Sequence, residues 1–162
     1  HPYYVKQYNN RWFLFGLESS KEYGNYITNK ALDRIVKFKP ATKIQFIPDT
    51  EFDFKDFFKD IVGVTIPGDH PLPEKVVLKF DEQRFPYIVS KPIHPSQAII
   101  DENEHTIGLY IRPNKELEAQ IFSFGPQVEV LEPLWLREQI YEKIVENCKK
   151  YSPVQNDCIT EN

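Results

Sequence analysis

The stretch Pro67-Gly68-Asp69-His70-Pro71-Leu72-Pro73 divides the chain into two parts with different sequence patterns. Three prolines and one glycine in seven residues are incompatible with a helix interior or a central strand, because proline has no amide hydrogen to donate. We therefore place a linker at 67–73, between a first domain at 1–66 and a second domain at 74–151. Residues 152–162 have no periodicity, which predicts a flexible tail.

Short strand-like runs dominate the first domain. Tyr3–Tyr8 and Arg11–Gly16 flank the pair Asn9-Asn10, which tolerates positive φ and therefore predicts a hairpin. Asp53 is the expected N-cap of a short helix that carries Phe54, Phe57 and Phe58. Further strands are predicted at Tyr23–Thr28, Leu32–Phe38 and Ile61–Ile66. Several short strands with one small helix indicate a small β-barrel.

The second domain alternates strand-like and helix-like periods. Strands are predicted at Lys75–Phe80, Gln97–Asp101, Thr106–Ile111 and Val128–Val130. A bent helix is predicted at Asp81–Val89, and a second helix is expected between the N-cap Asn114 and Gly125. Pro133 opens a final helix with apolar positions at Leu136, Ile140, Ile144 and Cys148. The order β-α-β-β-α-β predicts a ferredoxin-like domain with an added C-terminal helix. The expected fold class is thus mixed β and α+β.

Composition narrows the class of protein. Hydrophobic residues make up 41% of the 162 residues, which is enough for a packed core, and no apolar run is long enough to span a bilayer. The net charge of −4 argues against sequence-independent binding of duplex DNA, so any anionic ligand requires a local basic cluster. Cys148 and Cys158 fit reduced thiols, and we expect a cytoplasmic protein. The absence of Met predicts an excised fragment of a longer chain.

Six short blocks carry a family likeness in the right order and spacing. They are Arg11-Trp12-Phe13-Leu14, Ala31–Ile35, Phe57–Val64, Pro92–Gln97, Phe122–Gly125 and Val128–Arg137. Together these blocks resemble bacterial WYL-domain transcriptional regulators that carry a WYL domain followed by a WYL C-terminal extension, the WCX domain. Phe13 stands where the family signature has Tyr, so any hydrogen bond of that hydroxyl is missing here.

The resemblance implies an architecture and a function. It implies that the first domain is a WYL domain with an Sm-like, SH3-type barrel, and that the second is a WCX domain. It further implies that an N-terminal helix-turn-helix domain, absent from this sequence, binds DNA in a homodimeric regulator. The two domains present would sense single-stranded nucleic acid or a nucleotide-like effector without catalysis.

Basic and aromatic residues of the first domain are the leading ligand candidates. The resemblance implies that Arg34 lies on the ligand-facing side of the barrel, where its guanidinium would grip a phosphate or a guanine edge; a surface ion pair is the alternative. Trp12 or Phe13 would stack on a base, but strand alternation allows at most one of them to face the ligand, and the other belongs to the core. Arg11 and Lys6 would add phosphate contacts or belong to a solvated strand edge.

Four residues of the second domain complete the candidates. His94, Ser96 and Gln97 form either a turn whose side chains bind backbone groups or a ligand-contacting turn, and catalysis is the least favoured interpretation because no orienting acid or nucleophile elbow accompanies them. Arg112 ends a strand and would reach a ligand, reach a partner chain, or remain a surface residue.

Metal and cofactor chemistry receives little support from the sequence. A zinc site formed by His70, His94 and His105 would have irregular spacing, and the acidic run Asp49, Glu51, Asp53 and Asp56 fits caps and a solvated face. No glycine-rich phosphate loop is present, and we expect no cofactor. Three functional hypotheses remain: an effector-binding regulatory module, a purely structural dimerisation unit, and a nucleic-acid-processing enzyme.

Overall fold

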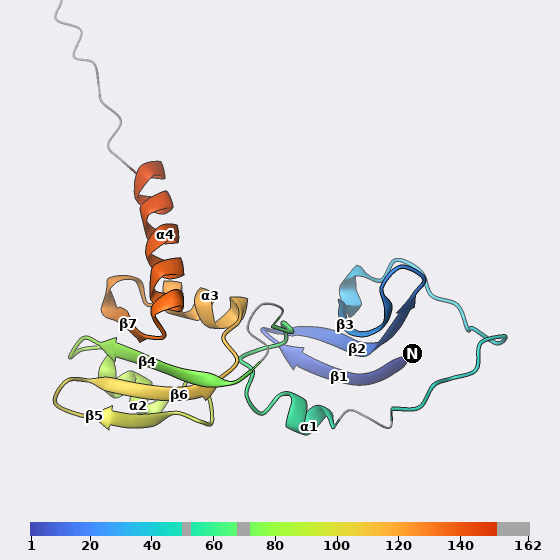
Figure 1. Ribbon diagram of the computed structural model, residues 1–162, viewed down its shortest axis with the longest axis horizontal. Helices are drawn as coiled ribbons and strands as arrows, with labels where there is room; N and C mark the ends of the chain where they lie inside the picture. Colours follow the sequence, from blue (N-terminus) through green and yellow to red (C-terminus); the bar gives the residue numbers. More distant parts are fainter. Residues whose placement is uncertain (50–52, 68–71, 152–162) are drawn as a thin grey trace, which may run out of the picture.

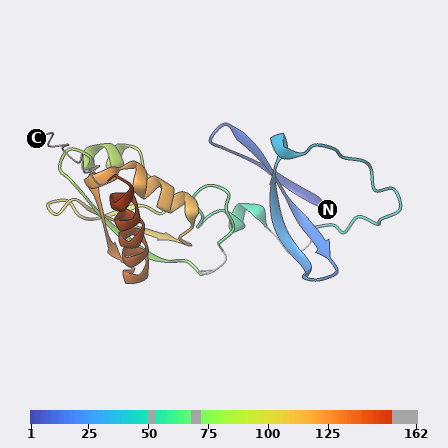
Figure 2. The same cartoon turned by 90° about the horizontal axis from the view of Figure 1, so that it is seen from above.

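The structure is a computed structural model that describes residues 1–49, 53–67 and 72–151, and within them the chain forms two antiparallel sheets. The two sheets lie at opposite ends of the longest axis (Figure 1). Helix α1 (Phe54–Phe57) lies against the first sheet, near its end toward the second half (Figure 2). The tail predicted at 152–162 and most of the linker predicted at 67–73 fall outside the described residues.

The first sheet contains β1 (Pro2–Tyr8), β2 (Arg11–Ser20) and β3 (Gly24–Ala31), in the order β1-β2-β3. The predicted hairpin is confirmed, because Tyr8 pairs with Arg11 and the two intervening asparagines have φ angles of 47° and 60°. Asn and Asp are the non-glycine residues that most readily adopt this left-handed conformation. The third strand is also confirmed, although it runs three residues further than predicted.

Two predicted strands of this half are wrong. Leu32–Arg34 form a short 3-10 helix, η1, and residues 35–49 continue without strand pairing on the side of the sheet away from the second half (Figure 2). Residues 61–66 form bends and loop. Among the described residues the first sheet therefore has three strands, and the expected Sm-like barrel is not confirmed.

Aromatic side chains hold α1 against the first sheet. Asp53 caps the helix as predicted, with its side chain accepting hydrogen bonds from the amides of Lys55 and Asp56. Phe54 is buried together with Phe15, and the rings of Tyr4 and Phe54 are stacked with centroids 5.2 Å apart. Edge-to-face and offset ring pairs of this kind stabilise a core beyond the area that they bury. Helix α1 thus packs against one face of the first sheet.

The second half has the predicted order of elements. It contains β4 (Glu74–Phe80), α2 (Phe85–Ser90), β5 (Ala98–Asp101), β6 (Thr106–Ile111), α3 (Lys115–Ser123), the 3-10 helix η2 (Gly125–Gln127), β7 (Val128–Glu132) and α4 (Leu134–Lys150). The sheet order is β5-β6-β4-β7, with every neighbouring pair antiparallel. The β-α-β-β-α-β order followed by a helix is confirmed, whereas the assignment to the ferredoxin-like class stays a prediction.

Helices α2, α3 and α4 bury their apolar sides in one large core with this sheet. Asn114 caps α3 as predicted, because its side-chain oxygen accepts the Leu117 amide at 3.0 Å. Leu136 and Ile140 of α4 are buried, but Ile144 is 51% exposed and Cys148 is also exposed. The final helix is confirmed, and of its four apolar positions only the first two are buried.

Residues 60–66, which we call the junction segment, connect the two cores. Val62 is buried in the large core of the second half, whereas Val64 is buried with Phe15 and Phe54 in the aromatic core of the first half. Gly63 lies between them with a φ of +73°. Adding a Cβ atom at Gly63 would place it 2.7 Å from Glu116 Cγ and 3.0 Å from Tyr8 Cζ, so this position requires glycine for both conformation and space.

We expect Gly63→Ala to destabilise the protein more than Gly24→Ala. Gly24 has a similar φ of +70°, but a Cβ atom there meets nothing within 4 Å. The two substitutions share a backbone cost of about 1 kcal/mol, and only Gly63→Ala adds a steric cost of roughly 1–3 kcal/mol. Urea denaturation of both variants measures the difference. Equal free energies of unfolding would contradict the tight packing at the junction segment.

Candidate ligand pocket at the junction of the two halves

Arg112 of the second half binds the start of the junction segment. Its Nε atom donates to Asp60 Oδ1 at 2.8 Å, its Nη2 atom donates to the Phe57 carbonyl at 2.6 Å, and its amide donates to the Asp60 carbonyl at 2.7 Å. The Arg112 and Asp60 side chains are only 15% and 14% exposed, and the guanidinium lies 5.1 Å from the centre of the Phe57 ring. A shielded, multiply hydrogen-bonded pair of this kind is costly to break.

Asn114 and Glu116 bind the rest of the segment. The Asn114 amide donates to the carbonyls of Val62 at 2.8 Å and Thr65 at 3.1 Å. Glu116 Oε1 accepts the Thr65 amide at 2.9 Å and the Thr65 hydroxyl at 2.6 Å. Residues 112, 114 and 116 thus each reach about 50 positions back along the chain, and together they bind the backbone of a segment that has no strand partner.

A pocket of about 370 Å³ lies where β1, β2 and β3 meet the junction segment and α3. Its walls are Tyr8, Asn9, Arg11, Phe13, Asn29, Val64, Thr65 and Glu116. The volume is within the range of small-molecule sites, and the mixture of rings and polar groups suits a planar polar ligand. We call it the junction pocket. Because both halves contribute walls, a ligand here would contact both.

Two of the predicted ligand residues line the junction pocket. Arg11 forms an ion pair with Asp33 at 3.2 Å, and both side chains are about half exposed. Phe13 is partly buried against the aromatic core.

Arg34, the leading candidate from the sequence, is exposed beside Asp33 at the end of η1, and it has no hydrogen bond or ion pair with the described part of the chain. Arg34 does not line the pocket, but it neighbours the residue that pairs with Arg11.

Lys6 lies on the same sheet face as Phe13, its partner across the β1–β2 ladder. Its Nζ atom lies 3.8 Å above the centre of the Phe58 ring. Partial burial lowers the pKa of Lys6, and the nearby Glu116 carboxylate opposes this effect. The Lys6 ammonium is therefore held by a ring face near the pocket.

Trp12 lies apart from these residues. Strand alternation places it on the opposite face of β2 from Phe13, and its side chain is 48% exposed. Phe13 both packs into the core and lines the pocket, so the expectation that the residue turned away from the ligand belongs to the core is wrong for Trp12.

The predicted turn residues His94, Ser96 and Gln97 are occupied by local hydrogen bonds. Gln97 Oε1 accepts the Ile93 amide at 3.0 Å, and Gln97 Nε2 donates to the Ile88 carbonyl at 2.9 Å. The Ser96 amide donates to His94 Nδ1 at 3.1 Å, so the proton of the neutral imidazole is on Nε2. Ser96 Oγ is 2.8 Å from the same nitrogen and also accepts the Tyr110 amide. His94 is only 6% exposed, and burial lowers its pKa.

Six pocket residues were missed by sequence reasoning, namely Tyr8, Asn9, Asn29, Val64, Thr65 and Glu116. Asn9 was singled out only for its turn conformation. The sequence does identify Asn114 as a helix cap, which places Glu116 in the first turn of α3, but no local signal indicates that this carboxylate binds Thr65.

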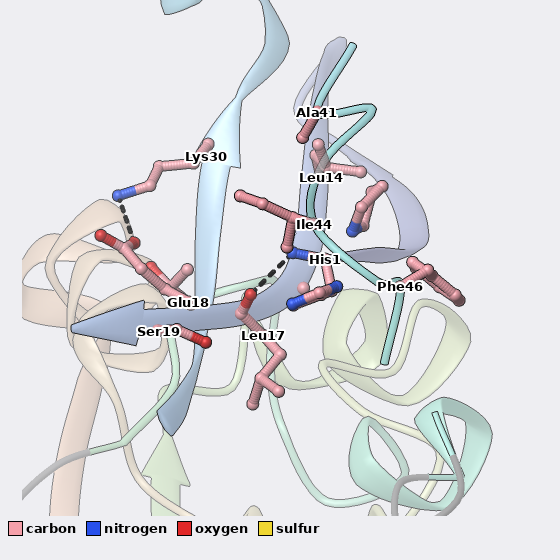
Figure 3. Close-up of a pocket in the computed structure, with 12 residues that line it drawn as sticks. His1, Leu14, Leu17, Glu18, Ser19, Lys30, Ala41, Ile44 and Phe46 are labelled. Atoms are coloured by element: carbon pink, nitrogen blue, oxygen red, sulfur yellow. Dashed lines mark hydrogen bonds and ion pairs between the residues drawn. The ribbon is translucent and has the colours of Figure 1, made fainter. Parts of the chain in front are cut away.

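A second, larger pocket lies on the other face of the first sheet (Figure 3). It has a volume of about 680 Å³ and a mostly apolar lining that includes Leu14, Leu17, Ile44 and Phe46. The ion pair between Lys30 Nζ and Glu18 Oε2, 3.0 Å apart, lies at its side (Figure 3). None of the ligand residues predicted from the sequence lines this pocket, so the junction pocket is the stronger candidate site.

Residues 1–49, 53–67 and 72–151 lack two kinds of feature, a metal-ligand cluster and a membrane-spanning helix. No group of three or more potential metal ligands occurs there, and no helix there has the length and apolar character needed to cross a bilayer. His70 of the zinc site considered from the sequence, Glu51 of the acidic run and Cys158 lie outside the described residues.

Comparison with protein families identifies the second half. Residues 72–146 match the WCX domain family. These residues form a WCX domain. This match confirms the family likeness that the sequence blocks of this half indicate. No curated protein is significantly similar in sequence to the chain.

One similar solved structure is that of proteasome accessory factor B/C (PafBC) of Arthrobacter aurescens. The sequence identity is 16% and the TM-score is 0.42, over 99% of this chain and 24% of that one. The chain with its WCX domain thus spans about a quarter of the length of this structure.

We expect the stability of the protein to fall below about pH 6.5 in a manner that depends on His94. The buried imidazole has a pKa below its ordinary value of 6.5, so the unfolded chain takes up a proton at a higher pH than the folded chain does. The contribution of His94 to the free energy of unfolding is fully present above pH 6.5. It is lost as the pH falls from 6.5 toward the pKa of His94 in the folded state. The measurement is urea denaturation of wild type and His94→Gln between pH 7.5 and 5. The variant should lose less stability than wild type across this range; parallel profiles would contradict the expectation.

Proposed function

We propose that this chain is the effector-sensing and dimerisation region of a bacterial, cytoplasmic transcriptional regulator. In this proposal residues 1–66 are a WYL domain of the Sm-like class and the WCX domain is ferredoxin-like. An upstream helix-turn-helix domain would bind DNA as part of a homodimer. The junction pocket supports the proposal most directly, because its walls come from both halves. A ligand that binds there with different affinity in two arrangements of the halves shifts the equilibrium between them.

The proposed effector is a single-stranded oligonucleotide or a nucleotide-like molecule. Arg11 and Arg34 would bind its phosphate oxygens, while the rings of Phe13 and Tyr8 would contact its base. The exposed Arg11–Asp33 pair contributes only about 0–1 kcal/mol, so a phosphate replaces the carboxylate at small cost. A local cluster of this kind lets a chain with a net charge of −4 bind an anion.

A structural dimerisation unit without an effector is the second candidate function. One observation favours it: α4 leaves Leu134, Tyr141 and Ile144 at least half exposed. Thermal denaturation in the presence of nucleotides and oligonucleotides separates the two functions, since a ligand that binds only the native state raises the midpoint. Catalysis is not part of the proposal, because His94 and Ser96 are engaged by each other and by backbone groups.

We expect Arg34→Ala and Arg11→Ala each to weaken binding of a short single-stranded oligonucleotide about tenfold, the usual effect of losing one charge-assisted hydrogen bond. Arg137→Ala is the matched control. Arg137 is 45% exposed and pairs with Glu129 at 2.7 Å, much as Arg11, also 45% exposed, pairs with Asp33. Fluorescence anisotropy at fixed salt measures the Kd values.

Arg137→Ala should bind like wild type, because this arginine lies on α4 and away from the junction pocket. If Arg34→Ala and Arg11→Ala also bind like wild type, the proposed ligand site is wrong. If no oligonucleotide or nucleotide binds wild type or raises its melting midpoint, the structural dimerisation unit becomes the better interpretation.

A further inference from the structure

Only one of the two Glu116 carboxylate oxygens accepts hydrogen bonds from the described residues. Its Oε1 atom accepts hydrogen bonds from the Thr65 amide and hydroxyl and from the Val64 amide at 3.4 Å. Its Oε2 atom is shielded from solvent and has no hydrogen-bond partner among the described residues. A carboxylate oxygen normally accepts hydrogen bonds when it is buried, because leaving water without a replacement donor is unfavourable. Oε2 is therefore a buried acceptor whose hydrogen-bonding capacity is unsatisfied among the described residues.

The surroundings direct this acceptor to the junction pocket. Glu116 forms part of the pocket wall together with Tyr8, Arg11 and Phe13. Gly63, which has no side chain, lets the Tyr8 ring and the Glu116 Cγ approach the same point. Tyr8 is partly buried in this packing. Burial raises the pKa of the Tyr8 hydroxyl, and the negative charge of Glu116 raises it further. The Tyr8 ring and the Glu116 side chain thus lie close together in the pocket wall.

The fixed oxygen makes the acceptor rigid. Three donors of the junction segment hold Oε1, and the first turn of α3 holds the backbone of Glu116, with Asn114 as the N-cap. The carboxylate cannot turn to present Oε1 instead without losing these hydrogen bonds. The pocket wall thus contains one rigid acceptor at Glu116 and one cation at Arg11, where the phosphate of the proposed effector would bind.

We propose that Glu116 selects effectors whose base carries an exocyclic amino group, as adenine, cytosine and guanine do, over thymine or uracil. The inference rests on the proposed nucleotide-sensing function and names the class of base that the same pocket takes. The exocyclic amino nitrogen of a base acts only as a hydrogen-bond donor, so it can donate to a carboxylate oxygen. The N3–H of thymine or uracil lies between two carbonyl oxygens, which a carboxylate repels.

The test measures Kd values for oligo(dC), oligo(dA) and oligo(dT) of equal length with wild type, Glu116→Gln and Glu118→Gln. In Glu116→Gln the amide oxygen still accepts from Thr65, while the amide nitrogen replaces the free acceptor with a donor. Glu118 lies two residues further along α3 and pairs with Lys143, outside the junction pocket, so Glu118→Gln is the matched control.

Wild type and Glu118→Gln should bind oligo(dC) and oligo(dA) about tenfold more tightly than oligo(dT). In Glu116→Gln the difference should shrink to about twofold or less, with tighter binding of oligo(dT). A wild type without preference overturns the inference, and this result does not depend on how any variant folds. Retention of the full preference by Glu116→Gln also overturns it. If wild type binds none of the three, the proposed function fails, and the inference fails with it.

Discussion

The hydrogen bonds from Arg112, Asn114 and Glu116 to residues 60–66 are the interaction on which the rest of the structure depends. The junction segment has no strand partner, yet its backbone groups are partly buried and must be satisfied. Side chains of the second half supply donors and acceptors at alternate positions, and Asn29 of β3 donates to the Val64 carbonyl at 2.7 Å from the other side. The segment is therefore bound to both halves at once.

The same segment explains why the two halves share a pocket. Val62 and Val64 lie two residues apart, but they are buried in different cores, so the segment packs into both halves. The junction pocket lies beside this connection, with Arg11 and Phe13 on one side and Glu116 on the other. In the proposed function, a ligand that draws Arg11 toward its phosphate and engages Glu116 would act directly on the contact that joins the WCX domain to the first sheet. This is the physical link between binding and the proposed regulation.

Local patterns predicted much of the fold, because many elements are decided by short-range chemistry. Asn9-Asn10 specifies its turn through backbone conformation, and Asp53 and Asn114 begin helices through their own side-chain hydrogen bonds. The strand prediction at 61–66 is wrong for a definite reason. Its apolar residues alternate because successive valines enter two separate cores, which produces the same period as the two faces of a sheet. The run at 32–38 has strand-like residues but finds no partner, and Val36 and Phe38 are 99% and 88% exposed.

The candidate site was only partly predictable for the same reason. Arg11 and Phe13 belong to a recognisable block, but the contact between Glu116 and Thr65 joins residues 51 positions apart. No local period encodes such a contact, and the Arg112–Asp60 pair spans 52 positions. The histidine turn was the opposite case, since its short spacing already indicated the local hydrogen bonds that His94, Ser96 and Gln97 form.

Amide hydrogen exchange of the Thr65 and Val64 amides tests most directly whether residues 60–66 join the two halves. Thr65 donates to Glu116 Oε1 at 2.9 Å, so both amides should exchange slowly, at rates close to those of central strand β4 in the WCX domain. Exchange of Thr65 as fast as in the unpaired residues 36–39 would contradict the account, because the junction segment would then be free of the second half.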